Sequence, residues 1–66
     1  MRLIISSHAR DAMFERGIDE EQIKLAIQRG AKFKQTEGYL AVHTYLRIAY
    51  RKLDEETYKI KTVMVD

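Results

Sequence analysis

Hydrophobic and polar positions follow two different periods along this chain, and the change falls at Gly30. A short apolar run at residues 3–5 predicts an opening strand. The residues that follow it place apolar side chains at helical spacing, whereas those after Gly30 alternate apolar and polar side chains as β-strands do. We therefore expect an α+β domain with the order β-α-α-β-β-β, in which two short antiparallel helices pack on an antiparallel sheet.

Local signals delimit the two helices. Ser7 is the expected N-cap of a first helix over residues 8–16, which ends at Gly17 because glycine readily adopts the left-handed conformation. For a second helix, Asp19 is the expected N-cap, and Gln22 three residues later completes a capping box. Its apolar stripe is Ile23, Ala26 and Ile27, and Gly30 ends it.

The second half of the chain predicts three strands. Residues 31–35 form the first, and a turn follows at 36–38. Residues 39–51 contain no Gly, Pro, Asn or Asp, so we expect one long strand there, with His43, Tyr45, Arg47 and Arg51 on a common face. After a turn at 53–56, the last strand covers residues 57–65 and places Val63 and Val65 on an outer surface that a partner would cover.

Composition and length predict a single domain over residues 1–66. The hydrophobic share of 45% and the charged share of 33% are typical of a globular chain. There is no cysteine, so neither a disulfide nor a thiolate metal site supplements the small core. No apolar run is long enough to span a membrane, and the opening residues are too short for a signal peptide, so we expect a cytoplasmic protein. A domain of this size often depends on a partner, and a homodimer is one expectation.

Charge is concentrated in the middle of the chain. Residues 31–53 carry five Lys/Arg and one Glu, a net charge of +4, although the whole chain carries only +2. Aromatic residues are interleaved with these cations, a pattern that suits a polyanion with stackable bases. The other interpretation is a sheet with a lysine-rich solvent face. The candidate nucleic-acid-binding residues are Arg10, Lys32, Lys34, Tyr45, Arg51 and Lys52.

The only two histidines, His8 and His43, suggest acid–base chemistry. Metal-independent RNA cleavage needs a base for the 2′-hydroxyl, an acid for the leaving 5′-oxygen and cations for the phosphorane. The candidate catalytic residues are therefore His8, His43, Arg16 and Arg47, and surface roles for both histidines are the alternative. We expect no metal, because the i, i+3, i+7 spacing of His8, Asp11 and Glu15 is also that of a salt-bridged surface helix. The chain has no glycine-rich phosphate loop or nucleophile elbow, and no cofactor is expected.

The stretch from Ser7 to Ile18 resembles the opening helix of a small prokaryotic domain-of-unknown-function family, which typically reads His-Ala-x-x-Arg-Met-x-x-Arg-Gly-Ile. That family is similar to the RelE/ParE-like ribonuclease toxins. The resemblance implies a RelE-like domain that binds or cuts RNA without a metal, with a cognate antitoxin as partner. His8 and Arg16 match the motif, whereas Ala12 stands where it has arginine, and this departure bears on catalysis more than on the fold.

Three functional hypotheses follow from these observations. The first is an RNA-directed, toxin-like domain of a toxin–antitoxin type system that acts as a metal-independent endoribonuclease. The second is a non-catalytic small regulator or protein-interaction module, which the missing motif arginine and the small size favour. The third is nucleic-acid binding without cleavage, which would weaken steeply with salt.

Overall fold

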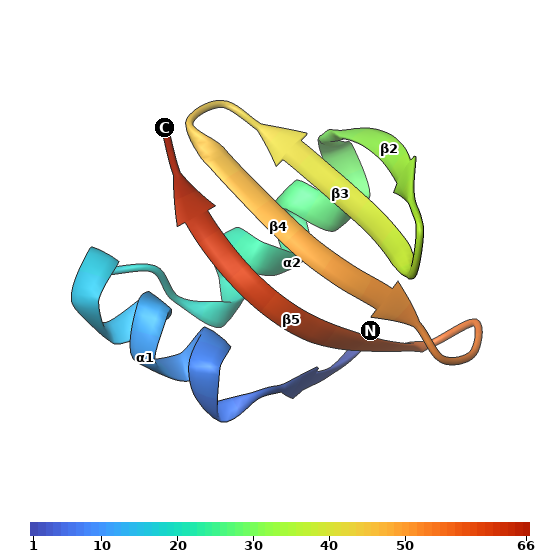
Figure 1. The fold of residues 1–66 in the computed structure, drawn as a ribbon, viewed down its shortest axis with the longest axis horizontal. Coiled ribbons are helices and arrows are strands. Elements are labelled where there is room, and N and C mark those ends of the chain that lie inside the picture. The colour runs from blue at the N-terminus through green and yellow to red at the C-terminus, as the bar shows by residue number, and fades with distance from the viewer.

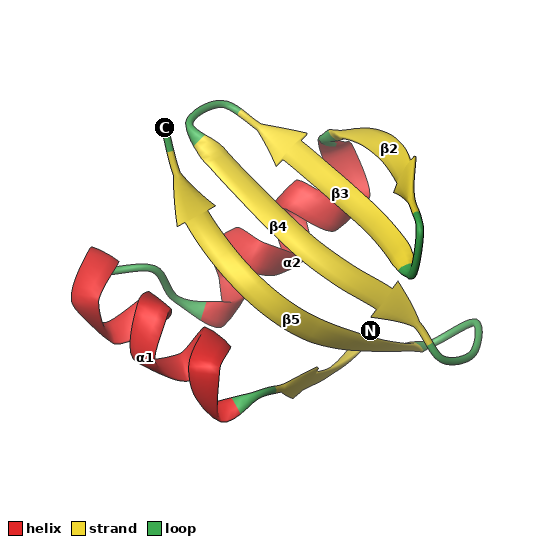
Figure 2. Ribbon diagram, in the orientation of Figure 1, coloured by secondary structure: helices red, strands yellow, loops and turns green.

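A five-stranded sheet forms one layer of the molecule, and two helices cover one of its faces (Figures 1 and 2). The computed structural model describes all 66 residues. The elements follow in the order β1 (Arg2–Ile5), α1 (Ser7–Arg16), α2 (Glu20–Arg29), β2 (Ala31–Gln35), β3 (Gly38–His43), β4 (Leu46–Lys52) and β5 (Thr57–Val65). The α+β class is confirmed, with four strands after the helices where three were expected.

The strands lie in the order β1-β5-β4-β3-β2. All neighbours are antiparallel except β1 and β5, which pair in parallel with Ile5 beside Ile60. The expected purely antiparallel sheet is therefore wrong at this pair. Parallel neighbours need a long connection, and here both helices and three strands separate β1 from β5 in the sequence.

The expected single strand over residues 39–51 is also wrong, because a two-residue turn divides it. His43 pairs with Leu46, and Thr44 and Tyr45 form the turn between β3 and β4. Thr44 has a φ of 55°, a left-handed conformation that Gly, Asn or Asp usually supplies. The turn was missed because none of those residues stands there. Paired residues across such a turn share a face, so His43 faces the same side as the buried Leu46.

A β-bulge corrects a second expectation, the outward placement of Val63. Tyr50 pairs with Ile60 and Ala49 with Thr62, which leaves Lys61 as the extra residue of β5. The bulge shifts the alternation by one residue, so that Ile60 and Val63 both point into the core. Val63 is only 1% exposed, whereas Val65 at the end of the strand is 39% exposed.

The core lies between the sheet and the two helices. α1 packs on β5, and α2 packs on β3 and β4. The helices diverge from their short connection and do not form the expected antiparallel pair (Figure 1). The fully buried larger side chains at the centre are Ile23, Ile48, Ile60 and Val63. Neither helix has the length and apolar character needed to cross a membrane.

The N-cap of α1 is Ser6 and not the expected Ser7. The Ser6 hydroxyl accepts a hydrogen bond from the Ala9 amide at 3.0 Å and donates one to the Lys61 carbonyl at 3.1 Å. The second contact joins the start of α1 to β5, 55 positions away in the sequence. A long-range partner thus decides between two adjacent serines that are equally suited to capping.

The signals of α2 are confirmed, including Gly30 as the residue that ends the helix, and Gly30 has a second role in packing. The Asp19 carboxylate accepts from the Gln22 amide at 2.9 Å, and the Gln22 side-chain oxygen accepts from the Asp19 amide at 3.0 Å. Gly17 has the expected left-handed φ of 66°. Gly30 is extended, and a Cβ there would lie 2.6 Å from the Val42 carbonyl oxygen. Glycine at position 30 therefore permits the close approach of β3.

We predict that Thr44→Gly stabilises the fold. Glycine accepts a positive φ without the cost of about 1 kcal/mol or more that other residues incur. A gain of about 1 kcal/mol raises the Tm of a domain of this size by roughly 4–8 °C, which calorimetry measures. Thr36→Gly in the β2–β3 turn is the control, because Thr36 has no positive φ, and its Tm should not rise. Equal shifts of Tm in the two variants would contradict the interpretation.

Candidate nucleic-acid interface

The strands of the sheet carry charge of one sign only. Eight Lys/Arg residues lie within the five strands and no Asp or Glu does. The ten acidic residues of the chain lie in helices, in connecting turns or at the C-terminal Asp66. The strand cations are Arg2, Lys32, Lys34, Arg47, Arg51, Lys52, Lys59 and Lys61.

No element covers the face of the sheet that points away from the helices, which we call the outer face (Figure 1). Arg47 and Arg51 of β4 point to it, because Leu46, Ile48 and Tyr50 alternate with them into the core. Lys59 of β5 is the direct cross-strand partner of Arg51. Like charges in opposite positions destabilise a sheet, and no carboxylate forms an ion pair with either side chain.

Apolar side chains lie beside these cations on the outer face. Phe33 pairs with Leu40, Leu40 with Ala49, and Ala49 with Thr62, so three apolar residues and Thr62 form a row across four strands. The Phe33 residue is 54% exposed at the β2 end of the row. The outer face therefore combines phosphate-binding cations with an exposed ring on which a base can stack.

Two further outer-face cations already have partners. The Arg47 guanidinium donates to the Asp66 carboxylate from Nε and from Nη2, each at 2.9 Å. The Lys61 Nζ donates to the Glu37 carbonyl at 3.0 Å and so reaches from β5 to the β2–β3 turn. Arg51 and Lys59 are consequently the more available cations for an anionic ligand.

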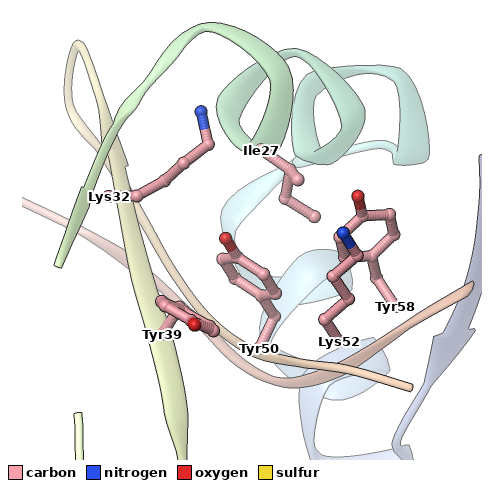
Figure 3. A pocket seen from close by; sticks show the side chains of 6 residues that line it. All are labelled: Ile27, Lys32, Tyr39, Tyr50, Lys52 and Tyr58. Atoms are coloured by element: carbon pink, nitrogen blue, oxygen red, sulfur yellow. The ribbon is translucent and has the colours of Figure 1, made fainter. Parts of the chain in front are cut away.

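The predicted basic and aromatic row is divided between the two faces of the sheet. Three of the predicted cations lie on the helix side of the sheet, on the opposite face from Arg51. Lys32 pairs with Ala41, Lys34 with Tyr39, and Lys52 with Tyr58. Lys32 and Lys52 line a pocket of about 280 Å³ together with Ile27, Tyr39, Tyr50 and Tyr58, which we call the tyrosine pocket (Figure 3). Lys34 lies on the exposed edge strand β2 outside this pocket.

The tyrosine pocket is built from packed rings. The ring of Tyr50 stacks on Tyr39, with centroids 5.8 Å apart, and meets Tyr58 in an edge-on contact at 5.7 Å. Burial raises the pKa of the Tyr50 hydroxyl, and the neighbouring Tyr58 and Tyr39 add to the rise by charge repulsion. Tyr50 is therefore a neutral hydrogen-bond donor at neutral and mildly alkaline pH.

His8 and Arg16 line a second hollow of about 520 Å³, between α1 and β5. Ala12 lies between them, and Thr62, Val63 and Met64 form the β5 side of this α1 hollow. Asp11 and Glu15 also line it, so the hollow carries two carboxylates beside one arginine and one histidine. Nowhere in the molecule do three His, Cys, Asp or Glu side chains come together as metal ligands.

The structure does not bring His8 and His43 together. His43 lies at the end of β3, two strands away from the β5 side of the α1 hollow. The expected common face of His43 with Arg47 and Arg51 is wrong, because the β3–β4 turn places His43 on the helix side of the sheet.

Two other predicted residues contact side chains of α2. Tyr45 lies in the β3–β4 turn, where its hydroxyl accepts from the Gln22 side-chain amide at 3.3 Å. Arg10 lies on α1 with a guanidinium nitrogen 3.9 Å from the Glu20 carboxylate, away from the strand cations. Neither residue belongs to the outer face.

Sequence reasoning missed Lys59 and Tyr58 as candidate site residues. Lys59 lies close to the acidic run at residues 54–56 in the sequence, although it pairs with Arg51 in the sheet. Tyr58 pairs with Lys52 and completes the tyrosine pocket. The β4–β5 turn at residues 53–56 was the available signal, because it implies that residues close to it on either side lie next to each other.

Comparison with known families gives one match. The model of a family described as "Domain of unknown function (DUF4258)" matches residues 5–65. Searches of curated proteins and of solved structures found no match.

We predict that Tyr50 makes the fold sensitive to alkaline pH. Folding raises the pKa of the Tyr50 hydroxyl above its ordinary value of 10.0. The neutral hydroxyl therefore contributes fully to stability below pH 10, and this contribution is lost as the pH rises through the folded-state pKa. The free energy of unfolding should therefore fall more steeply above about pH 10 in the native sequence than in Tyr50→Phe, as urea titrations measure. Tyr45→Phe, at an exposed ring, is the control and should keep the native slope. Identical slopes for the native sequence and Tyr50→Phe would refute this role.

Proposed function

The chain belongs to the DUF4258 family, and we propose that it is an RNA-directed domain of the RelE/ParE-like toxin type that binds single-stranded RNA on its outer face. One observation carries the proposal: the strands hold eight cations and no carboxylate, and one face of the sheet has no covering element. Such a surface attracts a polyanion and releases its condensed counterions on binding.

The pairing of Arg51 with Lys59 supports a phosphate ligand. The two cations repel each other in the free protein, and no side chain neutralises them. A phosphate bound between them would convert this repulsion into two charge-assisted contacts. A surface that is unfavourable in the free state and favourable in the complex is typical of a binding site.

The apolar row supports a single strand and not a duplex. Phe33 exposes about half of its surface, and Leu40 lies next to it on β3. Unpaired bases can stack on such a ring, whereas the bases of a duplex are stacked on each other and are out of reach.

The geometry favours binding over cleavage. The two histidines lie apart, so they cannot act on one phosphate as base and acid. The α1 hollow holds His8 and Arg16, but Asp11 and Glu15 oppose the approach of RNA to it. The proposed domain therefore retains RNA without cutting it.

We predict that Arg51→Gln/Lys59→Gln weakens binding of a single-stranded RNA of about 12 nucleotides by about tenfold near 0.1 M salt. The slope of log K against log salt should become shallower by about 1.4, since each lost phosphate contact accounts for about 0.7. Fluorescence anisotropy measures both quantities. The Tm should stay the same or rise, because the variant removes a repulsive pair.

The matched control is Lys24→Gln/Arg29→Gln. It changes the net charge by the same amount but lies on α2, away from the outer face. Equal loss of affinity in the two double variants would show that RNA senses only the net charge of the protein, and the outer-face proposal would fail.

We also predict that RNA incubated with the purified protein in EDTA stays intact, and that His8→Ala changes nothing. Gel electrophoresis of end-labelled RNA tests this. Cleavage that disappears in His8→Ala would overturn the binding-only proposal and place an endoribonuclease centre in the α1 hollow.

A protein-interaction module is the second candidate, and Phe14 favours it. This residue is 90% exposed on α1, where its neighbours one turn earlier are Arg10 and Asp11. An exposed ring of this kind is typical of a contact with a protein partner, such as an antitoxin or a second copy. Absence of RNA binding at low salt, together with a defined dimer in light scattering, would favour this candidate over the first.

A further inference from the structure

The tyrosine pocket lies on the helix side of the sheet, at the end of the sheet opposite to the β3–β4 turn. Ile27 of α2 forms one wall, and the other five lining side chains come from the strands. The hydroxyls of Tyr50 and Tyr58 and the ammonium of Lys32 point to the same side of the sheet, toward α2 (Figure 3).

The lining offers hydrogen-bond donors and positive charge without a carboxylate. Lys32 Nζ donates to the Gly30 and Gln28 carbonyls at 3.1 and 3.3 Å, and an ammonium has three donors, so one stays available. Lys52 Nζ lies 6.0 Å from the centroid of the Tyr58 ring and forms no ion pair. Two lysines and three tyrosines therefore line the pocket.

The size of the pocket limits its ligand. Its volume of about 280 Å³ is just below the range that is usual for small-molecule sites, about 300–1,000 Å³. A phosphate with its attached sugar fits this space, whereas a dinucleotide does not.

A further hollow, distinct from the α1 hollow, joins the tyrosine pocket to the outer face. Tyr39 and Lys52 line both, and Arg51 of the outer face also lines this connecting hollow, with Glu37 as its one carboxylate. Arg51 and Lys52 are consecutive residues of β4, so their side chains leave the strand on opposite faces. A chain bound at Arg51 can therefore reach Lys52 around the end of the sheet.

We propose that the tyrosine pocket binds a phosphate monoester between Lys32 and Lys52, either the terminal phosphate of an RNA or that of a free nucleotide. The RNA source rests on the proposed function, and the nucleotide source does not. Near neutral pH such a group is largely a dianion, since its second pKa is about 6. Tyr50 and Tyr58 donate to its oxygens, and the two ammonium groups neutralise its charge.

The experiment compares matched probes with and without the phosphate. The probes are adenosine 5′-monophosphate against adenosine, and an octanucleotide RNA with a 5′-phosphate, a 3′-phosphate or neither. Calorimetry and chemical shifts of the backbone amides measure binding. We expect at least one phosphorylated probe to bind about tenfold more tightly than its unphosphorylated counterpart. The shifts should be largest near Tyr39 and Lys52.

Two double variants test the site itself. Lys32→Gln/Lys52→Gln should abolish the difference between phosphorylated and unphosphorylated probes. Lys24→Gln/Arg29→Gln on α2 has the same change in net charge, lines no part of the pocket and should preserve the difference. Circular dichroism and the Tm confirm that both variants are folded, and Tyr58→Phe, which retains the ring, provides a milder second test of the pocket.

Each outcome decides the inference. A preference for adenosine monophosphate alone identifies a free nucleotide as the ligand, and a preference limited to the oligonucleotides identifies an RNA end. Equal binding of all matched probes, or equal effects of the two double variants, overturns the site. The proposed function fails separately, when the unphosphorylated octanucleotide does not bind while adenosine monophosphate still does.

Discussion

The two-residue turn at Thr44 and Tyr45 determines which side chains of the central strands face the helices. Side chains on a strand alternate between faces, so one residue more or less in the turn would exchange the two sets. With this turn, His43 and Leu46 pair, Ile48 and Tyr50 enter the core, and Arg47 and Arg51 remain outside. The strained backbone of Thr44 is tolerated because the pairing on both sides of the turn holds it. The bulge at Lys61 makes the same kind of adjustment in β5, where it allows Ile60 and Val63 to be buried together.

This sorting also divides the cations of the sheet into two groups. Arg51 and Lys59 face the open side, where they repel each other without a counter-charge. Lys32 and Lys52 face the helix side, where tyrosine rings and helix carbonyls surround them. Because consecutive residues of β4 belong to the two groups, one extended anionic ligand could contact both. The proposed RNA surface and the proposed phosphate pocket would then be two parts of one path around the end of the sheet.

The α1 hollow lies at the β5 edge of the sheet and shares only Thr62 with the outer-face row. His8, Ala12 and Arg16 are spaced by four residues, so they lie along one side of α1 and face Thr62 on β5. The small Ala12 side chain leaves the hollow open where the resembled motif has arginine. With Asp11 and Glu15 beside it, the hollow combines both charge signs, in contrast to the uniformly basic strands.

Local signals in the sequence determined the two helices and the turn that follows the strand at residues 31–35. The Asp19–Gln22 capping box, the left-handed Gly17 and the strand over residues 31–35 are all present as expected, because each depends on neighbours within a few positions. The concentration of cations after Gly30 was also evident from the sequence.

Tertiary structure alone decided the rest. The parallel pairing of β1 with β5 and the burial of Val63 depend on contacts between segments distant in sequence. The turn at Thr44 and the register that pairs Arg51 with Lys59 depend on how neighbouring strands align in the sheet. Periodicity cannot place a one-residue shift where no Gly, Asn or Asp marks it, and the face of every later side chain depends on that shift.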